Sequence, residues 1–465
     1  MTTLSYHSLT DASKAIEIGE TSSTALVEAA LARVEETDSR LNSFVRLMED
    51  SAYAESEAAT DRANSGRRLS PLDGIPIAVK DLYDTAGVVT AGGTGALSER
   101  VPANDARAVH LLRAAGAVIL GKTNTHELAL GATTNNAHYG PTRNPWNLDR
   151  VPGGSSGGSA SAVASGQALG ALGSCTGGSI RIPAAFCGIS GHKPTYGLVS
   201  RAGVIPLSGT LDHAGPIARS AEDCALMLNV LAGHDEQDLD SVERPPEDFT
   251  ADLNTEISGM TFAVIPSLID GSDDAILENF EKSLDMFRGL GVSIEQREPL
   301  AGEENWRQRI APIIPAEAGS LNEVVLQIQG QSDGVAEPQR RRMLRGLETP
   351  VADYIRALET RKIVEAAYQA ALQGIDAYII PTSPIVAEPI ADDPREERPP
   401  ASKLRNTSVF NLTHQPSISV PNGFDADGLP TGLMISTALF QDAKALGIAH
   451  VYQQATDFHL QAPPI

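Results

Sequence analysis

The sequence predicts an α/β protein with a mostly parallel or mixed β-sheet. Short apolar segments typical of buried strands alternate along the chain with longer segments of helical periodicity. Hydrophobic residues make up 42% of the 465 residues and charged residues 20%, which is an ordinary globular composition. A chain of this length can bury a large core, so it needs no metal or disulfide for stability.

The N-terminal third follows this alternation. Residues 1–50 are expected to be helical, because apolar side chains recur at helical spacing from Leu26 to Val34. The segment PLDGIPIAVK contains a strand, since its isoleucines and valine alternate with other residues. A helix capped by Asp105 then ends at Gly116, and the run AVIL after it is a short buried strand.

The rest of the chain repeats the pattern. A capping box at Ser220–Asp223 begins a helix that Gly233 ends, and the acidic, proline-containing residues 235–252 form a loop. A second exposed loop is expected at Glu388–Pro400, where prolines and acidic residues mix. Further strands are expected at four places: Thr261–Ile265, Ala377–Ile380, Ser417–Val420 and Leu433–Ser436.

Charge and cysteine content exclude several classes of protein. The formal net charge of −23 repels phosphates and anionic membranes, so we expect no nucleic-acid partner and no membrane association. The arginine-rich run Gln339–Arg345 is interpreted as a solvated helix face. Only three cysteines occur, and the N-terminus has no basic segment followed by an apolar run. We therefore expect a cytoplasmic protein without disulfides.

The segment Gly116–Thr123 (GAVILGKT) matches the pattern of a phosphate-binding P-loop. That motif works because a glycine-rich loop turns its backbone N–H groups toward the phosphates. The interior here is Ala-Val-Ile-Leu, which favours a buried strand. We therefore expect no nucleotide site.

The segment Gly153–Pro183 (GGSSGGSASAVASGQALGALGSCTGGSIRIP) admits three interpretations. A hydrolase elbow of the GxSxG type needs a strand directly before it, but the preceding NPWNLDRVP is loop-like. A flexible linker would be Gly and Ser throughout, whereas SASAVASGQALGALG is rich in alanine and predicts a helix. The third interpretation is serine chemistry assisted by a lysine base.

Lys80 is the candidate base. A lysine amine accepts a proton only when neutral, so its pKa must fall from about 10.4 to about 7–8. Lys80 ends the apolar strand IPIAV, where desolvation disfavours the ammonium form. Asp81 would oppose this shift, but successive side chains of a strand point to opposite faces.

Taken together, Lys80, GGSSGGS at Gly153–Ser159 and GGSIR at Gly177–Arg181 resemble the amidase signature family. Ser155 and Ser179 are 24 residues apart, which is the spacing in that family. The resemblance extends over nearly the whole chain, through segments GPTRNPWN at Gly140–Asn147, AAFCGISGHKPTYG at Ala184–Gly197, PTSP at Pro381–Pro384, SISVPNGF at Ser417–Phe424 and ATDFH at Ala455–His459.

The resemblance implies a Ser-cisSer-Lys triad and the amidase signature fold, one large mixed β-sheet flanked by helices. Ser179 would be the nucleophile, Ser155 the bridging serine after a cis peptide bond, and Lys80 the base. The oxyanion hole would consist of backbone N–H groups of Ser179 and of the three residues before it: Thr176, Gly177 and Gly178. No metal or cofactor would be needed.

The resemblance also implies the division of the chain. Residues 1–465 would form a single amidase domain, and homodimers are common among relatives. Its parts would be N-terminal helices (1–65), the signature core (66–235), a variable substrate-pocket region (236–375) and a C-terminal part of the core (376–465). Ala129, Gly131 and Arg181 are candidate substrate contacts.

Two departures from the family pattern stand out. Cys175 occupies a position where the family usually has an aspartate, beside the arginine that matches Arg181. Another carboxylate or a water could take its place, or Arg181 could meet an anionic substrate. The segment Thr413-His-Gln-Pro416 replaces a small apolar Ala-Gly-Leu-Pro, which leaves the substrate contacts of the C-terminal part open.

These observations predict an amidohydrolase that cleaves a small-molecule carboxamide, or an ester, through an acyl-enzyme. Its expected partner is that small amide. Two alternatives are a glutamine-hydrolysing subunit of a tRNA-dependent amidotransferase and a catalytically silent binding protein on the same scaffold.

Overall fold

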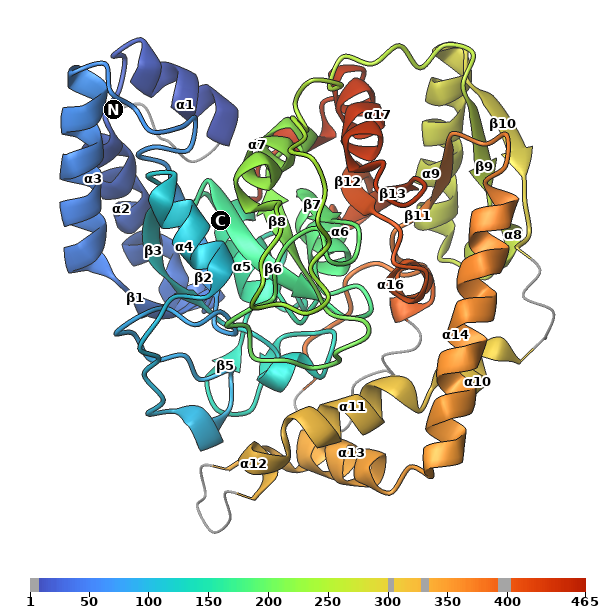
Figure 1. The fold of residues 1–465 in the computed structure, drawn as a ribbon. Coiled ribbons are helices and arrows are strands. Elements are labelled where there is room, and N and C mark those ends of the chain that lie inside the picture. The colour runs from blue at the N-terminus through green and yellow to red at the C-terminus, as the bar shows by residue number, and fades with distance from the viewer. Residues whose placement is uncertain (1–7, 300–304, 328–333, 392–402) are drawn as a thin grey trace.

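A single large β-sheet runs through the molecule (Figure 1). The computed structural model describes residues 8–299, 305–327, 334–391 and 403–465. Within these residues the sheet has eleven strands in the order β1-β3-β2-β6-β8-β7-β12-β13-β11-β9-β10. The strands are β1 (Phe44–Leu47), β2 (Pro76–Lys80), β3 (Val118–Thr123), β6 (Gly170–Cys175), β7 (Ser190–Lys193), β8 (His213–Ala218), β9 (Thr261–Val264), β10 (Ser293–Gln296), β11 (Ala377–Pro381), β12 (Ser417–Phe424) and β13 (Pro430–Ser436).

The sheet is mixed, as predicted. Strand β2 pairs in parallel with both β3 and β6, and β9 pairs in parallel with β10 and β11. The central pairs β6–β8, β7–β8, β7–β12 and β12–β13 are antiparallel. A separate two-stranded hairpin joins β4 (Asn135–Asn136) to β5 (Gly140–Pro141).

Helices cover both faces of the sheet. The larger ones are α1 (Leu9–Glu17), α2 (Ser23–Leu41), α3 (Glu49–Asn64), α4 (Arg107–Ala114), α5 (Gly157–Ala164), α6 (Arg181–Cys187), α7 (Ala221–Leu231), α9 (Asp274–Gly289), α11 (Ile313–Leu321), α13 (Glu337–Leu347), α14 (Val351–Ala371) and α17 (Asp442–Gln454). Shorter ones are α8 (Pro266–Ile269), α10 (Trp306–Ile310), α12 (Glu323–Leu326) and α16 (Ser408–Leu412), with 3₁₀ turns η2 (Gly95–Leu97), η3 (Glu127–Ala129) and η5 (Phe458–Leu460).

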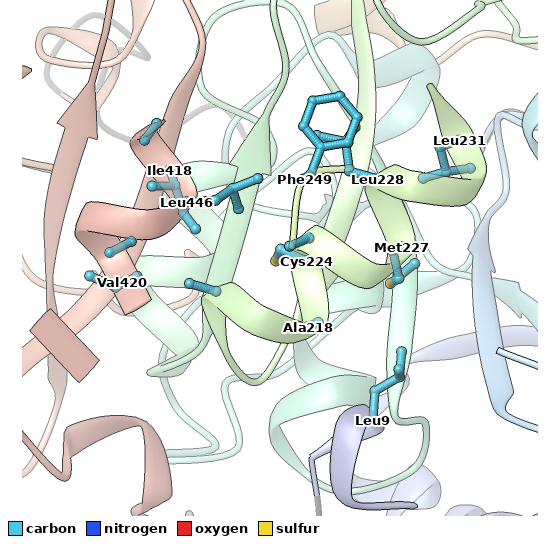
Figure 2. Packing of buried hydrophobic residues seen from close by; sticks show 14 of the residues in the cluster. Leu9, Ala218, Cys224, Met227, Leu228, Leu231, Phe249, Ile418, Val420 and Leu446 are labelled. Atoms are coloured by element: carbon cyan, nitrogen blue, oxygen red, sulfur yellow. The ribbon is translucent and has the colours of Figure 1, made fainter. Parts of the chain in front are cut away.

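Two hydrophobic layers sandwich the sheet. In β2, Ile77 and Val79 join the layer that contains α7 and α17, whereas Ala78 joins the layer that contains α5 and α6. This alternation is what a strand buried on both faces requires. Figure 2 shows the first layer, where Cys224 and Leu228 of α7 lie near Phe249 and near Leu446 of α17.

Most predicted strands are confirmed. The strand in PLDGIPIAVK is β2, the AVIL run is β3, and the four later strands correspond to β9, β11, β12 and β13. The run GAVILGKT therefore continues as a strand through Thr123 and forms no phosphate loop. The capping box at Ser220 is also present, with both of its hydrogen bonds.

Three element predictions are wrong in part. The first 50 residues contain an edge strand, β1, because Asn42 in a left-handed conformation ends α2 and turns the chain onto β3. Helix α4 begins without a side-chain cap, since Asp105 instead accepts from the Ala86 N–H and pairs with Arg113. At the start of the expected loop at 388–400, Glu388 is buried against Lys403, and residues 392–400 lie outside the described residues.

The alanine-rich helix predicted after Ser155 is shorter than expected. Helix α5 ends at Ala164, and the chain returns as strand β6 between β2 and β8. Small residues serve both elements. Gly170 and Gly173 lie so close to Met227, Ile77 and Ile217 that a Cβ atom on either glycine would come within 3.0 Å of a neighbouring side chain. The small-residue composition of this segment therefore does not distinguish a tightly packed strand from a helix.

In Figure 1, α11, α12 and α13 lie together below the sheet, and α14, with α10 beside it, runs from them toward β9 and β10. Glu317 of α11 joins this group to the core. Its carboxylate accepts hydrogen bonds from Ser208, Thr210 and Tyr354. The run Gln339–Arg345 in α13 is a solvated face only in part. Arg341 and Arg345 are exposed, whereas Arg340 and Arg342 are half-buried and Gln339 Nε2 lies 2.9 Å from His126 Nε2. Within the described residues, no helix is long and apolar enough to cross a membrane.

Candidate active site

Lys80 ends β2 in a fully buried position surrounded by serine hydroxyls. Its Nζ lies 2.8 Å from Ser155 Oγ, 2.8 Å from Ser156 Oγ and 2.9 Å from Ser174 Oγ. No carboxylate pairs with it in the described part of the chain. Asp81 points elsewhere, toward Lys122 at 3.5 Å, so the two neighbours in sequence do not form an ion pair. Three neutral hydroxyls can hold the lysine without requiring it to be charged.

The protonation of Lys80 follows from this burial. Desolvation lowers the pKa of Lys80 to about 7, although Cys175 and Asp212 oppose the shift. A base with a pKa near the working pH is present in its neutral form and still binds a proton well. The prediction that burial lowers the pKa of this lysine is confirmed.

Ser155 follows the cis peptide bond that the family resemblance implied, between Gly154 and Ser155. Its carbonyl accepts from the Thr125 hydroxyl at 2.9 Å and from the His126 N–H at 3.1 Å. Thr134 Oγ1 donates to the Gly153 carbonyl at 2.9 Å and accepts from the N–H of Gly157 at the start of α5. Residues 125–134 thus fix the turn that presents the Ser155 hydroxyl to Lys80.

Ser179 lies on the turn between β6 and α6. Its carbonyl accepts from the Ser156 N–H at 3.3 Å, so the two serine-containing turns are in direct contact. The Ser179 hydroxyl forms no hydrogen bond to any described residue and remains 6% exposed. It is therefore free to approach a ligand.

The backbone before Ser179 presents unpaired donors. Within the described residues, the N–H groups of Thr176, Gly177, Gly178 and Ser179 have no hydrogen-bond acceptor. Gly178 has φ +154°, and a Cβ atom there would lie 2.3 Å from Thr407 Oγ1. Thr407 in turn donates to the Gly177 carbonyl at 2.6 Å. The turn is therefore held from behind while its N–H groups remain available for a negatively charged oxygen.

A cavity of about 290 Å³ reaches the start of this turn at Thr176, although Ser179 itself is not among the residues that line it. Ser174, Thr176 and Ala129 border it on the inside, and Leu239, which is 98% exposed, borders it at the surface. Most of its wall is apolar. A pocket this small accommodates a small ligand. Asp212 closes one side, where it accepts from the Thr176 hydroxyl at 2.5 Å.

The other candidate substrate contacts lie differently. Ala129 lines the cavity, whereas Gly131 does not; a Cβ on Gly131 would lie 2.0 Å from the His126 ring. Arg181 is fully buried and contacts Ser417, Asn411, Met434 and Cys175. Its role in substrate binding stays a prediction.

The segment Thr413–Pro416 is held by internal contacts. His414 stacks on Tyr196 with ring centroids 4.1 Å apart, and its Nε2 lies 2.9 Å from the Thr210 carbonyl oxygen. The departure from the family pattern at this segment therefore builds an aromatic contact near the cavity.

Several residues of the site could not be singled out from the sequence. Ser156 and Ser174 contact Lys80, and Asp212 and Thr407 support the turn before Ser179. Ser156 carries a signal, since it adjoins Ser155 in the same Gly-Gly-Ser repeat. Asp212 and Thr407 carry none, because only the fold brings them to the turn. In the described residues no cluster of His, Cys, Asp or Glu could hold a metal ion.

The family model described as Amidase matches residues 25–446. This chain belongs to the amidase signature family. The predicted fold and the resemblance are therefore confirmed, and the chain is an amidase-type enzyme acting on C–N bonds.

Three similar proteins illustrate the range of the family. One subunit of the glutamyl-tRNA(Gln) amidotransferase of Chromohalobacter salexigens is 38% identical over 98% of each chain. A structure described as a vestigial protein complex, revealing the evolutionary origins of an s-triazine catabolic enzyme, has TM-score 0.88 and 33% identity over 96% of this chain and 98% of that one. The native peptide amidase of Stenotrophomonas maltophilia has TM-score 0.84 and 31% identity over 98% of each chain.

One expectation is contradicted by these relatives. We expected a small amide as the substrate and no nucleic acid as a partner, yet the matched amidotransferase chains are subunits of an enzyme named for a tRNA. The charge argument failed because a net charge of −23 bears only on direct contact between this chain and phosphates. It says nothing about an assembly in which another subunit supplies the positive charge.

Proposed function

We propose that this chain is the amide-hydrolysing subunit of a tRNA-dependent amidotransferase and that it releases ammonia from glutamine. The observation that carries the chemistry is the buried Lys80, with its pKa lowered to about 7 and three serine hydroxyls within 2.9 Å. The similarity to amidotransferase subunits over nearly the full length supports the role in an assembly. The three buried, unpaired cysteines agree with a cytoplasmic location.

The reaction begins with addition of Ser179 to the carboxamide, which gives a tetrahedral intermediate. Neutral Lys80 takes the proton of Ser155, and Ser155 takes the proton of Ser179 as the Ser179 oxygen attacks the carboxamide carbon. The carbonyl oxygen becomes negatively charged and accepts hydrogen bonds from the N–H groups of residues 176–179. Each such donor is worth about 2.7–4 kcal/mol in a comparable site.

The second half returns the protons. Ser155 passes its proton to the departing nitrogen and is reprotonated from Lys80, the C–N bond breaks, and ammonia leaves. A water molecule then attacks the acyl carbon through the same relay, which frees the carboxylic acid and restores the Ser179 hydroxyl. The relay needs no histidine, because Lys80 supplies the base.

A second candidate is a self-contained amidase that acts on another small carboxamide. The cavity favours this candidate in one respect, because its walls are mostly apolar and include Leu82, Val204, Ile205 and Leu207. The solved peptide amidase, a relative of similar length and fold, supports it as well.

Labelling and turnover assays test both candidates. A fluorophosphonate probe should label the wild-type chain and fail to label Ser179→Ala; equal labelling of both would refute the assigned nucleophile. Glutamine should be hydrolysed to glutamate and ammonia, with higher activity when the chain is isolated with its native partners from its source cells. If the lone chain instead cleaves an aliphatic, aryl or ureido amide at least tenfold more efficiently than glutamine, the second candidate holds.

A further inference from the structure

Arg181 is a buried cation that contacts no carboxylate. Its side chain has no exposed surface, and within the described residues it forms no ion pair with Asp or Glu. Nη1 donates to Ser417 Oγ at 2.9 Å, and Nη2 donates to Asn411 Oδ1 at 2.5 Å. Nε has no acceptor in the described part of the chain. A guanidinium stays charged in any protein, so this burial requires an anion nearby.

The surroundings of Arg181 are rich in positive or neutral groups. Lys193 of β7 is fully buried, and the one described residue to which its Nζ donates is Pro194, whose carbonyl oxygen lies 3.0 Å away. His213 of β8 and Lys80 of β2 are buried on neighbouring strands. Asp212 is the acid nearest this group in sequence, but its carboxylate is engaged by Thr176 and by backbone N–H groups of the loop before it.

Among the described residues that Arg181 contacts, Cys175 is the one whose side chain can become an anion. Its Sγ lies 3.5 Å from the donor Arg181 Nη2, and 3.7 Å from both the donor Nδ2 and the acceptor Oδ1 of Asn411. A thiolate accepts from Nη2 and Nδ2, whereas a thiol would donate to Oδ1. Burial by itself would raise the pKa of Cys175, but the Arg181 guanidinium and the backbone N–H of Ile180 lower it below its usual value. Arg181 and Ile180 follow directly on the turn that carries Ser179.

We propose that Cys175 is a thiolate in the folded protein, that it is the counter-ion of Arg181, and that this ion pair positions the turn carrying Ser179. Cys175 is the last residue of β6 and Arg181 is the first residue of α6. The contact between the sulfur and the guanidinium therefore joins the two ends of the turn that carries Ser179. The thiolate also raises the affinity of Lys80 for a proton. The existence of the thiolate does not depend on the proposed function, whereas its expected effect on catalysis does.

The first test measures the thiolate directly. Thiolates have an ultraviolet absorption band that thiols lack, and an ordinary cysteine is mostly a thiol at neutral pH. The folded wild-type protein should show this band near pH 7 and lose it on acidification, and Cys175→Ser should lack it. Burial raises the pKa of both Cys187 and Cys224, so Cys187→Ser and Cys224→Ser serve as matched controls that keep the band. Absence of the band from folded wild-type protein would overturn the proposal, whatever the activity.

The second test uses the pH profile of kcat/KM on whichever amide is turned over. If Cys175 is a thiolate in the wild-type protein, Cys175→Asp should keep most of the activity. It should also leave the acid limb of the kcat/KM profile at the same pH. Cys175→Ser moves the limb to lower pH by on the order of 0.5–1 unit, since Lys80 loses a nearby anion. The Cys175→Ser variant should also have an at least about tenfold lower kcat/KM, because Arg181 is left without a counter-ion.

A neutral thiol gives the opposite pattern. Cys175→Ser would then leave the limb in place, while Cys175→Asp would introduce a new anion and move the limb to higher pH. That pattern would refute the ion pair. A purely structural defect would lower activity without moving the limb in either variant, and this too would contradict the proposal.

Discussion

Lys80 Nζ lies at the same distance, 2.8 Å, from Ser155 Oγ as from Ser156 Oγ. The two hydroxyls differ in what else they contact. Ser156 Oγ lies 3.2 Å from the Ser174 carbonyl, so its proton already has an acceptor. Ser155 Oγ has Lys80 as its one hydrogen-bond partner among the described residues. The proton of Ser155 is therefore the one available to a neutral lysine.

This difference predicts unequal effects of two similar substitutions. Ser155→Ala should lower kcat by roughly 10²–10⁴, the usual contribution of a positioned proton-transfer group. Ser156→Ala should have a much smaller effect on kcat, since it removes a contact of Lys80 but leaves the relay intact. Steady-state kinetics on both variants, with circular dichroism to check folding, would measure this. Equal losses would show that the two serines share the relay.

The rate should depend on pH through Lys80. Only the neutral amine accepts a proton, so kcat/KM should rise as pH increases through about 7 and then level off. Lys80→Arg should be inactive across the range, because a guanidinium does not lose its proton. A profile of kcat/KM between about pH 5 and 9 would check this, and an acid limb near the pKa of an ordinary carboxyl group would contradict it.

The same shift predicts a gain in stability when the lysine is removed. In the unfolded chain Lys80 binds a proton up to about pH 10.5, but in the folded protein only below about 7. Between these values protonation favours the unfolded state, so stability from this group rises with pH. Lys80→Met should therefore be more stable at pH 7 by about 1–4 kcal/mol, and the difference should vanish toward pH 10.5. Denaturant unfolding at the two pH values would measure it.

The sequence was most informative where a local pattern determines the structure. Alternating apolar residues identified β2. The two Gly-Gly-Ser segments drew attention to serine chemistry, and the family resemblance singled out Ser155 and Ser179 as candidates. The lowered pKa of Lys80 could also be predicted, because a strand that is apolar on both faces buries whatever ends it.

The sequence was least informative where the fold joins distant segments. Thr407, Asn411 and Asp212 support the turn before Ser179, yet only the folded sheet brings them from distant parts of the chain to this turn. Strand β6 was missed because glycine and alanine are poor strand formers, and its place between β2 and β8 outweighs that preference. The contact between Cys175 and Arg181 is local, and the resemblance had placed the two residues side by side. The charge of Cys175 could not be predicted from the sequence, because an ordinary cysteine is mostly a neutral thiol at neutral pH.

A side chain at Gly178 should disrupt the turn. Gly178→Ala would place a Cβ atom 2.3 Å from Thr407 Oγ1 at a φ of +154°, so either the backbone or Thr407 must move. We expect a loss of stability of about 1–3 kcal/mol and at least tenfold lower kcat. Gly289→Ala, in a helix with no atom within 4 Å, is the control and should be neutral or slightly stabilising. Thermal unfolding and kinetics on both variants would decide; similar behaviour would show that the turn tolerates a side chain.

We expect Glu317, which lies outside the sheet, to hold in place the loop that borders the cavity. Its carboxylate accepts from Ser208 Oγ at 2.5 Å, Thr210 Oγ1 at 2.8 Å and Tyr354 OH at 2.7 Å, which ties α11 and α14 to the loop beside the cavity. Glu317→Ala leaves these donors without an acceptor, and should cost on the order of 2–3 kcal/mol. Because the loop borders the cavity through Leu207, KM should rise more than kcat falls.

The matched control for this prediction is Glu323→Ala. Glu323 is exposed on α12, and its side chain lies 3.4 Å from Gln327 Nε2, a weak surface contact. Hydrogen exchange should speed up in α11 and in residues 207–212 of Glu317→Ala, but in neither region of the control. Unchanged exchange around residues 207–212 in Glu317→Ala would mean that the loop holds its conformation without the carboxylate, and that KM is set by the sheet side of the cavity alone.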